Sequence, residues 1–332
     1  MDYEKFMQQA ILLAQKYRYT TKPNPVVGAL ILHKNEVICQ GAHEQYGGAH
    51  AEVNCLNELK KLNITNTENL TLICTLEPCN HFGKTPPCTD AIIASGIKRV
   101  VIGSDDPNPK VSGTGIKKMV ENGIEVIEDV LRQETINLNK FFFFKHKTKR
   151  PFITIKLASS KDGKSHNNDG SSTWITSEAS RSDVQIVRAK HDAILTGGNT
   201  VRNDNPRMNA RVNFPVNQPK KILLTAQRNW DKNLHFFQNA DVEIFNLGDL
   251  KKVIDSISQT EINSILVEAG PKLVNSFIKN ELCDQLIIYE SNKELGDAGV
   301  PWFDSPDLID RYGFKVKSNY TIGPDTKMVF EK

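Results

Sequence analysis

The sequence lacks any apolar run of the roughly 18 residues that a membrane-spanning helix requires. Its Met1 end is polar and enters an amphipathic pattern, without the apolar region of a secretory leader. Six cysteines in 332 residues are too few for a dense disulfide framework. These absences predict a cytoplasmic protein with reduced thiols and no membrane partner.

The sequence also has no strong excess of charge of one sign, since its net charge is only +3. No dense Lys/Arg run is interleaved with aromatic residues, so nucleic acid is not an expected partner. No Gly-x-Gly-x-x-Gly motif follows an expected strand, so the sequence gives no support for a Rossmann dinucleotide site. What remains is an ordinary globular composition, with 39% hydrophobic and 24% charged residues, in a chain long enough for two domains.

The residues that carry recognisable chemistry are concentrated between positions 50 and 88. His50, Cys79 and Cys88 form a zinc-quality ligand set with a vacant fourth position. Glu52 lies beside them and can transfer protons, so we assign it as the catalytic residue. A structural zinc site is the alternative, but it would require four protein ligands. This inventory predicts a zinc enzyme that activates water.

Strands alternate with helices through the first half, which predicts an α/β/α sandwich with its site at strand ends and helix starts. Helices are expected over residues 3–17, 50–62 and 88–95, and strands over 26–32, 70–76 and 98–103. Positions i and i+2 of a helix point about 200° apart. His50 and Glu52 can therefore serve one metal only if both lie at the first turn of their helix.

Eight residues separate Cys79 from Cys88, where zinc deaminases usually have two. The stretch from Thr75 to Cys88 resembles the signature of the bifunctional riboflavin-biosynthesis deaminase/reductase family, as do Pro23-Asn24-Pro25 and Asp106-Pro107-Asn108-Pro109. The resemblance implies a cytidine-deaminase-like fold and a small-molecule substrate, 2,5-diamino-6-(5-phosphoribosylamino)pyrimidin-4-one, whose ring amine is replaced by oxygen. The substrate-binding residues that it implies are Asn24, His81, Lys84, Asp106 and Asn108.

A charged segment that ends at Pro151 marks the expected domain boundary. We expect a deaminase domain over residues 1–145, a linker over 146–151 and a second domain over 152–332. In that domain, the pattern predicts a strand over 152–158, a helix that begins at Thr176 or Ser177, and a largely β end from Phe314 to Phe330. Further strands are expected at 193–196, 222–224, 242–245, 265–268 and 286–289.

The family resemblance continues through this half, for example in Lys156-Leu157-Ala158, Trp174-Ile175-Thr176 and Asp204-Asn205-Pro206. It implies a dihydrofolate-reductase-like α/β domain that uses NADPH to reduce the ribosyl group to a ribityl chain. The ribotide contacts that it implies are Lys156, Ser172, Arg188, Met208, Arg211 and Glu268. The cofactor contacts that it implies are Ala158, Trp174, Thr200, Asp204, Gly270, Pro271 and Lys272. We also expect a homo-oligomer.

Two positions depart from the family pattern. Met208 stands where the family commonly has leucine, which conserves volume. Thr225-Ala226 replaces the usual Asp-Ser, which removes a hydroxyl that relatives can offer to the cofactor. The change therefore bears on the strength of cofactor binding and on the NADPH preference.

Two other functions remain to be weighed. A nucleoside or RNA-editing deaminase would have a two-residue gap between its cysteines, a basic or aromatic surface and no second domain. A protein with a non-catalytic second half would hold ribotide or aid oligomerisation there. Lys156, Asp204 and Glu268 argue against the second alternative, whereas Ala226 is compatible with it.

Overall fold

The computed structural model describes residues 2–332 except 65, 83–85, 110, 169–173 and 247. The chain divides into two compact units, residues 1–148 (unit 1) and 149–332 (unit 2). The division falls inside the expected linker, and helix α6 (Lys140–Thr148) runs up to it. Within the described part of the chain, no helix has both the length and the apolar character needed to cross a membrane.

Unit 1 is built on a five-stranded sheet of order β2-β1-β3-β4-β5, in which β3, β4 and β5 are parallel. Its strands are β1 (Gly28–His33), β2 (Glu36–Ala42), β3 (Leu70–Cys74), β4 (Arg99–Ile102) and β5 (Glu125–Ile127). Its other helices are α1 (Tyr3–Gln15), α2 (Ala51–Lys61), α3 (Cys88–Ser95), α4 (Thr114–Glu121) and α5 (Arg132–Leu138).

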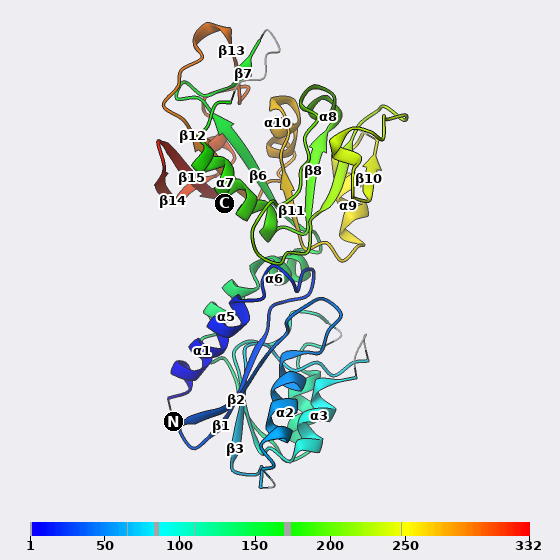
Figure 1. Cartoon of the computed structure of the whole chain (residues 1–332), viewed down its shortest axis with the longest axis vertical. Helices are drawn as coiled ribbons and strands as arrows, with labels where there is room; N and C mark the ends of the chain where they lie inside the picture. Colours follow the sequence, from blue (N-terminus) through cyan, green and yellow to red (C-terminus); the bar gives the residue numbers. More distant parts are fainter. Residues whose placement is uncertain (1, 65, 83–85, 110, 169–173, 247) are drawn as a thin grey trace. The chain divides into compact units, whose positions relative to one another are not determined.

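Side chains that alternate along β1 divide the core of unit 1 between two faces. Ala29 and Ile31 join the core that α2 and α3 cover, whereas Leu30 and Leu32 join the core that α1 covers. Figure 1 shows α1 on one side of the sheet and α2 and α3 on the other. The expected α/β/α sandwich is therefore confirmed. It places the end of β3 next to the start of α2 and the start of α3.

Unit 2 is built on an eight-stranded sheet of order β10-β9-β8-β11-β6-β12-β15-β14. The strands from β10 to β12 in this order are parallel, and β15 and β14 continue the sheet antiparallel. The strands are β6 (Phe152–Ser159), β8 (Ala193–Gly197), β9 (Lys220–Leu224), β10 (Val242–Phe245), β11 (Ser264–Val267), β12 (Gln285–Glu290), β14 (Lys315–Ile322) and β15 (Asp325–Glu331).

Helices cover both faces of this sheet. The helices α9 (Leu250–Ser258) and α10 (Pro271–Lys279) pack on one face, and α7 (Glu178–Lys190) and α8 (Gly198–Asp204) pack on the other. Ser177 caps α7, as expected, by accepting a hydrogen bond from the Ser180 amide. The remaining elements are β7 (Lys164–Asn167) and β13 (Gly299–Pro301), which form a two-stranded sheet, and α11 (Leu308–Arg311).

The sequence analysis did not predict α8, α9 or the β7–β13 pair. Helix α9 carried a readable signal, because Leu250, Val253, Ile254 and Ile257 are spaced for one helical face and are buried. The aromatic stretch at positions 141–144 lies in α6, where Phe142 and Phe143 pack against the core of unit 1.

Candidate functional site

The three predicted metal ligands meet at one point in unit 1. The Nδ1 atom of His50 lies 3.2 Å from the Sγ atom of Cys88 and 3.5 Å from that of Cys79. The ligand atoms of all three residues lie within 4.8 Å of one another. Cys79 follows the end of β3, and Cys88 is the first residue of α3. The fold therefore brings His50 and Cys88, which are 38 positions apart in the sequence, into direct contact.

This donor set fits a zinc ion. Donors held tetrahedrally at about 2.0–2.3 Å from a common ion lie about 3.5 Å apart, which matches the separations found here. Hydrogen bonding from the Cys88 thiol and from His50 outweighs burial and lowers the pKa of Cys79 to about 4. A sulfur that is already a thiolate at neutral pH is the form that binds zinc.

Glu52 lies at the first turn of α2, as the prediction for a shared site required. His50 is the N-cap of this helix, which begins at Ala51, so both residues lie at the same helix end. The Glu52 side chain is buried, and burial raises its pKa to about 7. A carboxyl group with a pKa near neutral can both accept and release a proton at working pH.

A second buried carboxylate, Glu77, organises the loop that follows β4. Its Oε2 atom accepts hydrogen bonds from the amides of Asp106 (3.1 Å) and Gly113 (3.0 Å), and its Oε1 atom accepts from Gly115 (3.0 Å) and Ile116 (3.2 Å). A Cβ atom at Gly115 would lie 2.2 Å from the Pro78 carbonyl oxygen, so only glycine allows this approach. Glu77 therefore fastens the start of α4 to the chain just before Cys79.

We expect Glu77→Gln to loosen this loop. The glutamine side chain has one oxygen that accepts hydrogen bonds, and its NH2 group would face two backbone N–H donors that now bond to a carboxylate oxygen. Hydrogen bonds to charged groups contribute about 1.5–3 kcal/mol each, so a loss of unfolding free energy in that range is expected for unit 1. Hydrogen–deuterium exchange should become faster at residues 106–116. Glu121→Gln, at the exposed end of α4, is the matched control. Unchanged protection in the Glu77 variant would contradict this role.

Three of the five predicted deaminase substrate residues form hydrogen bonds in unit 1: Asn24, Asp106 and Asn108. Asn24 Nδ2 lies 3.2 Å from His43 Nε2, while His43 Nδ1 lies 3.0 Å from the Ala49 carbonyl oxygen. The His43 ring packs edge-on against His50, with centroids 5.4 Å apart. Asp106 Oδ1 accepts a 2.8 Å hydrogen bond from the Asn108 amide, and burial raises the Asp106 pKa to about 7.

The remaining two candidates follow Cys79 directly. The buried Nδ1 atom of His81 has no hydrogen-bond partner among the described residues. Its neighbour Phe82 is 81% exposed. Lys84 lies outside the described residues. An unsatisfied ring nitrogen beside the ligand set is consistent with a polar ligand at that position.

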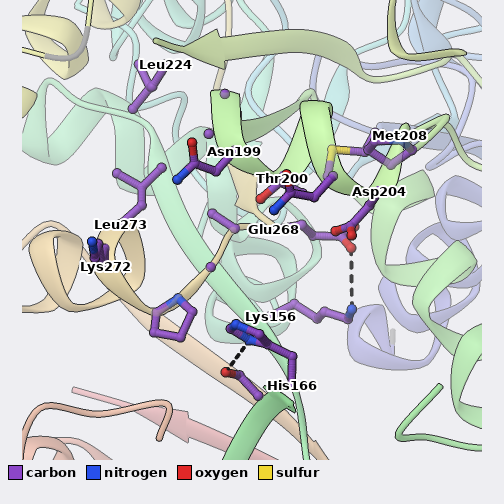
Figure 2. A pocket seen from close by; sticks show the side chains of 18 of the residues that line it. Lys156, His166, Asn199, Thr200, Asp204, Met208, Leu224, Glu268, Lys272 and Leu273 are labelled. Carbon is purple, nitrogen blue, oxygen red and sulfur yellow. Dashed lines mark hydrogen bonds and ion pairs between the residues drawn. The ribbon is translucent and has the colours of Figure 1, made fainter. Parts of the chain in front are cut away.

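Unit 2 contains a cavity of about 1630 Å³ at the carboxyl ends of its parallel strands. Every predicted cofactor or ribotide residue that the structure describes in this unit lines the cavity. Ser172 lies outside the described residues. Figure 2 shows Lys156, Thr200, Asp204, Met208, Glu268 and Lys272 around this space. The ribotide and cofactor residues implied by the family resemblance therefore come from distant segments of the sequence, and the fold brings those that are described together at one cavity.

One wall of this cavity carries a buried ion cluster. Arg188 Nε lies 2.6 Å from Glu268 Oε1 and its Nη2 lies 2.9 Å from Oε2, while Lys156 Nζ lies 3.4 Å from Oε2. Burial acts to raise the pKa of Glu268, but the charges of Arg188 and Lys156 outweigh it and lower the pKa to about 2. Arg211 lines the same cavity, and its pKa is lowered by burial and by the charges of Arg188 and Arg207.

The cavity fits a dinucleotide together with a sugar phosphate. Among the described residues, seven Lys or Arg side chains and two carboxylates line it, which suits ligands with several phosphate groups. The basic residues are Lys156, Arg181, Arg188, Arg202, Arg207, Arg211 and Lys272, and the carboxylates are Asp204 and Glu268. Gly197, Gly198 and Gly270 line it at strand ends, and an added Cβ atom at Gly270 would meet no atom within 4 Å. Backbone N–H groups at such turns can approach phosphates.

Comparison with known proteins gives consistent matches over both units. Residues 1–104 match the family model for the cytidine and deoxycytidylate deaminase zinc-binding region, and residues 151–328 match that for the RibD C-terminal domain. The chain is 36% identical to the riboflavin biosynthesis protein RibD of Bacillus amyloliquefaciens, over 98% of this chain and 95% of that protein. It is 34% identical to RibD of Escherichia coli, over 98% of both chains.

Comparison with solved structures identifies the same family of proteins. RibD of Acinetobacter baumannii superposes with a TM-score of 0.91 at 32% identity, covering 99% of this chain and 98% of that one. A Thermotoga maritima protein described as a diaminohydroxyphosphoribosylaminopyrimidine deaminase/5-amino-6-(5-phosphoribosylamino)uracil reductase gives 0.85 at 34% identity, with the same coverage. The expected cytidine-deaminase-like and dihydrofolate-reductase-like folds are confirmed. The chain therefore belongs to the RibD family and is a bifunctional deaminase and reductase of riboflavin biosynthesis.

Proposed function

We propose that unit 1 converts 2,5-diamino-6-(5-phosphoribosylamino)pyrimidin-4-one into 5-amino-6-(5-phosphoribosylamino)uracil, and that unit 2 then reduces the ribosyl group of this product. The observation that carries the proposal is the contact of His50, Cys79 and Cys88 beside the buried Glu52. The pairing of the two activities in the Thermotoga maritima relative supports the substrate assignment. Zinc and NADPH are the cofactors of such an enzyme.

In unit 1 we assign His50, Cys79 and Cys88 as the zinc ligands. Zinc held there would activate a water molecule for attack at neutral pH. Glu52 takes a proton from the water and delivers it to the departing amine, so that water is consumed and ammonia is released. Asn24, Asp106 and Asn108 are assigned to the pyrimidine ring, and His81 and Lys84 to the ribotide phosphate.

In unit 2 the reaction breaks the bond between C1′ and the ring oxygen of the ribose and adds a hydride at C1′. NADPH bound in the cavity would supply the hydride, and the ring oxygen takes up a proton as the ribose opens. We assign the ion cluster of Lys156, Arg188 and Glu268 to the sugar, because it offers both donors and acceptors for hydroxyl groups. Arg211 suits the phosphate, since a bound dianion would offset the repulsion from Arg188 and Arg207.

The other ribotide and cofactor assignments remain proposals. Met208 and Ser172 are assigned to the ribotide, and the cofactor contacts are assigned to Ala158, Trp174, Thr200, Asp204, Gly270, Pro271 and Lys272. Cytoplasmic residence is consistent with six free, buried cysteines. Assembly into a homo-oligomer stays a prediction, which light scattering on the purified protein would test.

The test is NADPH oxidation after addition of the diaminopyrimidinone ribotide, with zinc bound and with zinc removed. Oxidation that requires zinc is expected, because the reductase would then depend on deamination. Oxidation without zinc would reverse the proposed order of the two steps. Absence of oxidation with zinc bound would contradict the reductase assignment and favour a second unit that only binds ribotide.

A further inference from the structure

Arg202 is a cavity-lining residue that the assignments above do not use. It belongs to α8, which follows β8 directly, and its side chain is exposed on the cavity wall. Its Nη1 atom donates a 2.7 Å hydrogen bond to Gln227 Oε1, and its Nη2 atom donates to Asn199 Oδ1. The guanidinium group also lies 5.4 Å from the centroid of the Trp230 ring. Three neutral side chains thus hold Arg202 in one orientation: Asn199 from its own helix, and Gln227 and Trp230 from the loop after β9.

The charge of Arg202 is not compensated by its partners. Asn199 and Gln227 accept hydrogen bonds through amide oxygens, and no carboxylate forms an ion pair with Arg202 in the part of the chain that the structure describes. By contrast, Arg188 in the same cavity is paired with Glu268. A fixed guanidinium group with spare donors fits a phosphate, which accepts hydrogen bonds from its planar fork.

The position of Arg202 corresponds to one end of the cavity. The ion cluster of Lys156, Arg188 and Glu268 lies at β6, β11 and α7. Arg202 instead contacts Gln227 and Trp230, which follow β9, and β9 is separated from β11 by β8 in the sheet. With the ribotide and the nicotinamide at the ion cluster, an extended dinucleotide would place its adenosine half at this other end.

We propose that Arg202, held by Asn199 and Gln227, binds the 2′-phosphate of NADPH and so provides the preference for NADPH over NADH. The inference rests on the proposed function in taking a nicotinamide dinucleotide as hydride donor. The 2′-phosphate is the group by which NADPH differs from NADH. Ala226, at the turn after β9, has no hydroxyl group to offer to this phosphate, whereas Arg202 offers a charge-assisted contact from the neighbouring helix.

The test is calorimetric titration of NADPH and of NADH into the full-length protein and its Arg202→Met variant. Methionine keeps an unbranched stem against Trp230 and removes the charge. We expect the Kd for NADPH to rise about ten- to hundredfold and the Kd for NADH to stay within about twofold. Arg228→Met is the matched control, since Arg228 is exposed nearby and does not line the cavity. Arg202→Lys should recover part of the affinity for NADPH.

Three outcomes would overturn the inference. They are an unchanged Kd for NADPH in the Arg202→Met protein, an equal loss for both dinucleotides, or a wild-type protein that does not distinguish the two. A wild-type protein that binds neither dinucleotide would instead overturn the reductase proposal itself, and this inference with it. Unfolding curves for each variant separate a lost contact from a lost fold, and no change is expected for this exposed side chain.

Discussion

Glu52→Gln is expected to lower the rate of ammonia release about 10²–10⁴-fold while the protein keeps one zinc ion per chain. Glutamine has the same shape as the neutral acid, but it cannot carry a proton from water to the amine. Glu52 lies outside the set of ligand atoms that meet within 4.8 Å, so its loss should not release the metal. Single-turnover ammonia release and metal content by mass spectrometry would measure the two effects separately.

Glu58→Gln is the matched control, because Glu58 is an exposed carboxylate on the same helix and pairs only with Lys61 among the described residues. That variant should deaminate at the wild-type rate. Loss of stoichiometric zinc from the Glu52→Gln protein would show that Glu52 is a ligand. Retained zinc with a wild-type rate would show that another group transfers the proton.

Removal of Arg188 is expected to destabilise unit 2 by about 3–5 kcal/mol, because it leaves Glu268 buried with only the more distant Lys156 as a counter-charge. The Arg188→Met variant keeps the apolar stem and tests this loss. All three tryptophans, Trp174, Trp230 and Trp302, lie in unit 2, so their fluorescence during urea unfolding of the full chain reports on this unit. Such a local probe is needed because a chain with two compact units has no single unfolding free energy.

Arg311→Met provides the comparison, because both side chains of the Arg311–Asp307 pair are 58% exposed, so its removal should leave the unfolding of unit 2 nearly unchanged. A second change, Glu268→Gln in the Arg188→Met background, removes the unpaired charge and should restore about 1 kcal/mol or more. A loss below about 1 kcal/mol in the single variant would mean that Glu268 does not depend on Arg188.

Local patterns in the sequence were sufficient to predict the metal ligands and the elements that carry them. His50 and Glu52 stand two positions apart, so a shared site required both to lie at the first turn of the helix expected over residues 50–62. Helix α2 meets this requirement, because it begins at Ala51 with His50 as its N-cap. The strand that ends before Cys79 and the helix that begins at Cys88 were also predicted, because each is marked by an apolar run or a helix-start residue. Hydrophobic periodicity thus specified the elements that position the ligands.

Contacts between distant segments were not predictable in the same way. Glu77 was read only as part of a motif, yet its partners lie 29 to 39 positions later, and its hydrogen bonds go to backbone groups of no particular residue type. His43 had no signal in the sequence, although it contacts Asn24 and His50. Arg188 and Glu268, predicted separately as ribotide contacts, pair with each other across 80 positions. Such pairings exist only once the topology is formed.

The order of strands in unit 2 has a consequence for how the chain folds during synthesis. β6, the first strand of this unit, pairs with β11 and β12, and β15 lies between β12 and β14. The sheet of unit 2 can therefore be complete only after residues 325–331 have been synthesised, whereas the strands of the sheet in unit 1 all lie within residues 28–127. Pairings between such distant segments form slowly. Unit 1 should therefore fold first, before the sheet of unit 2 has formed.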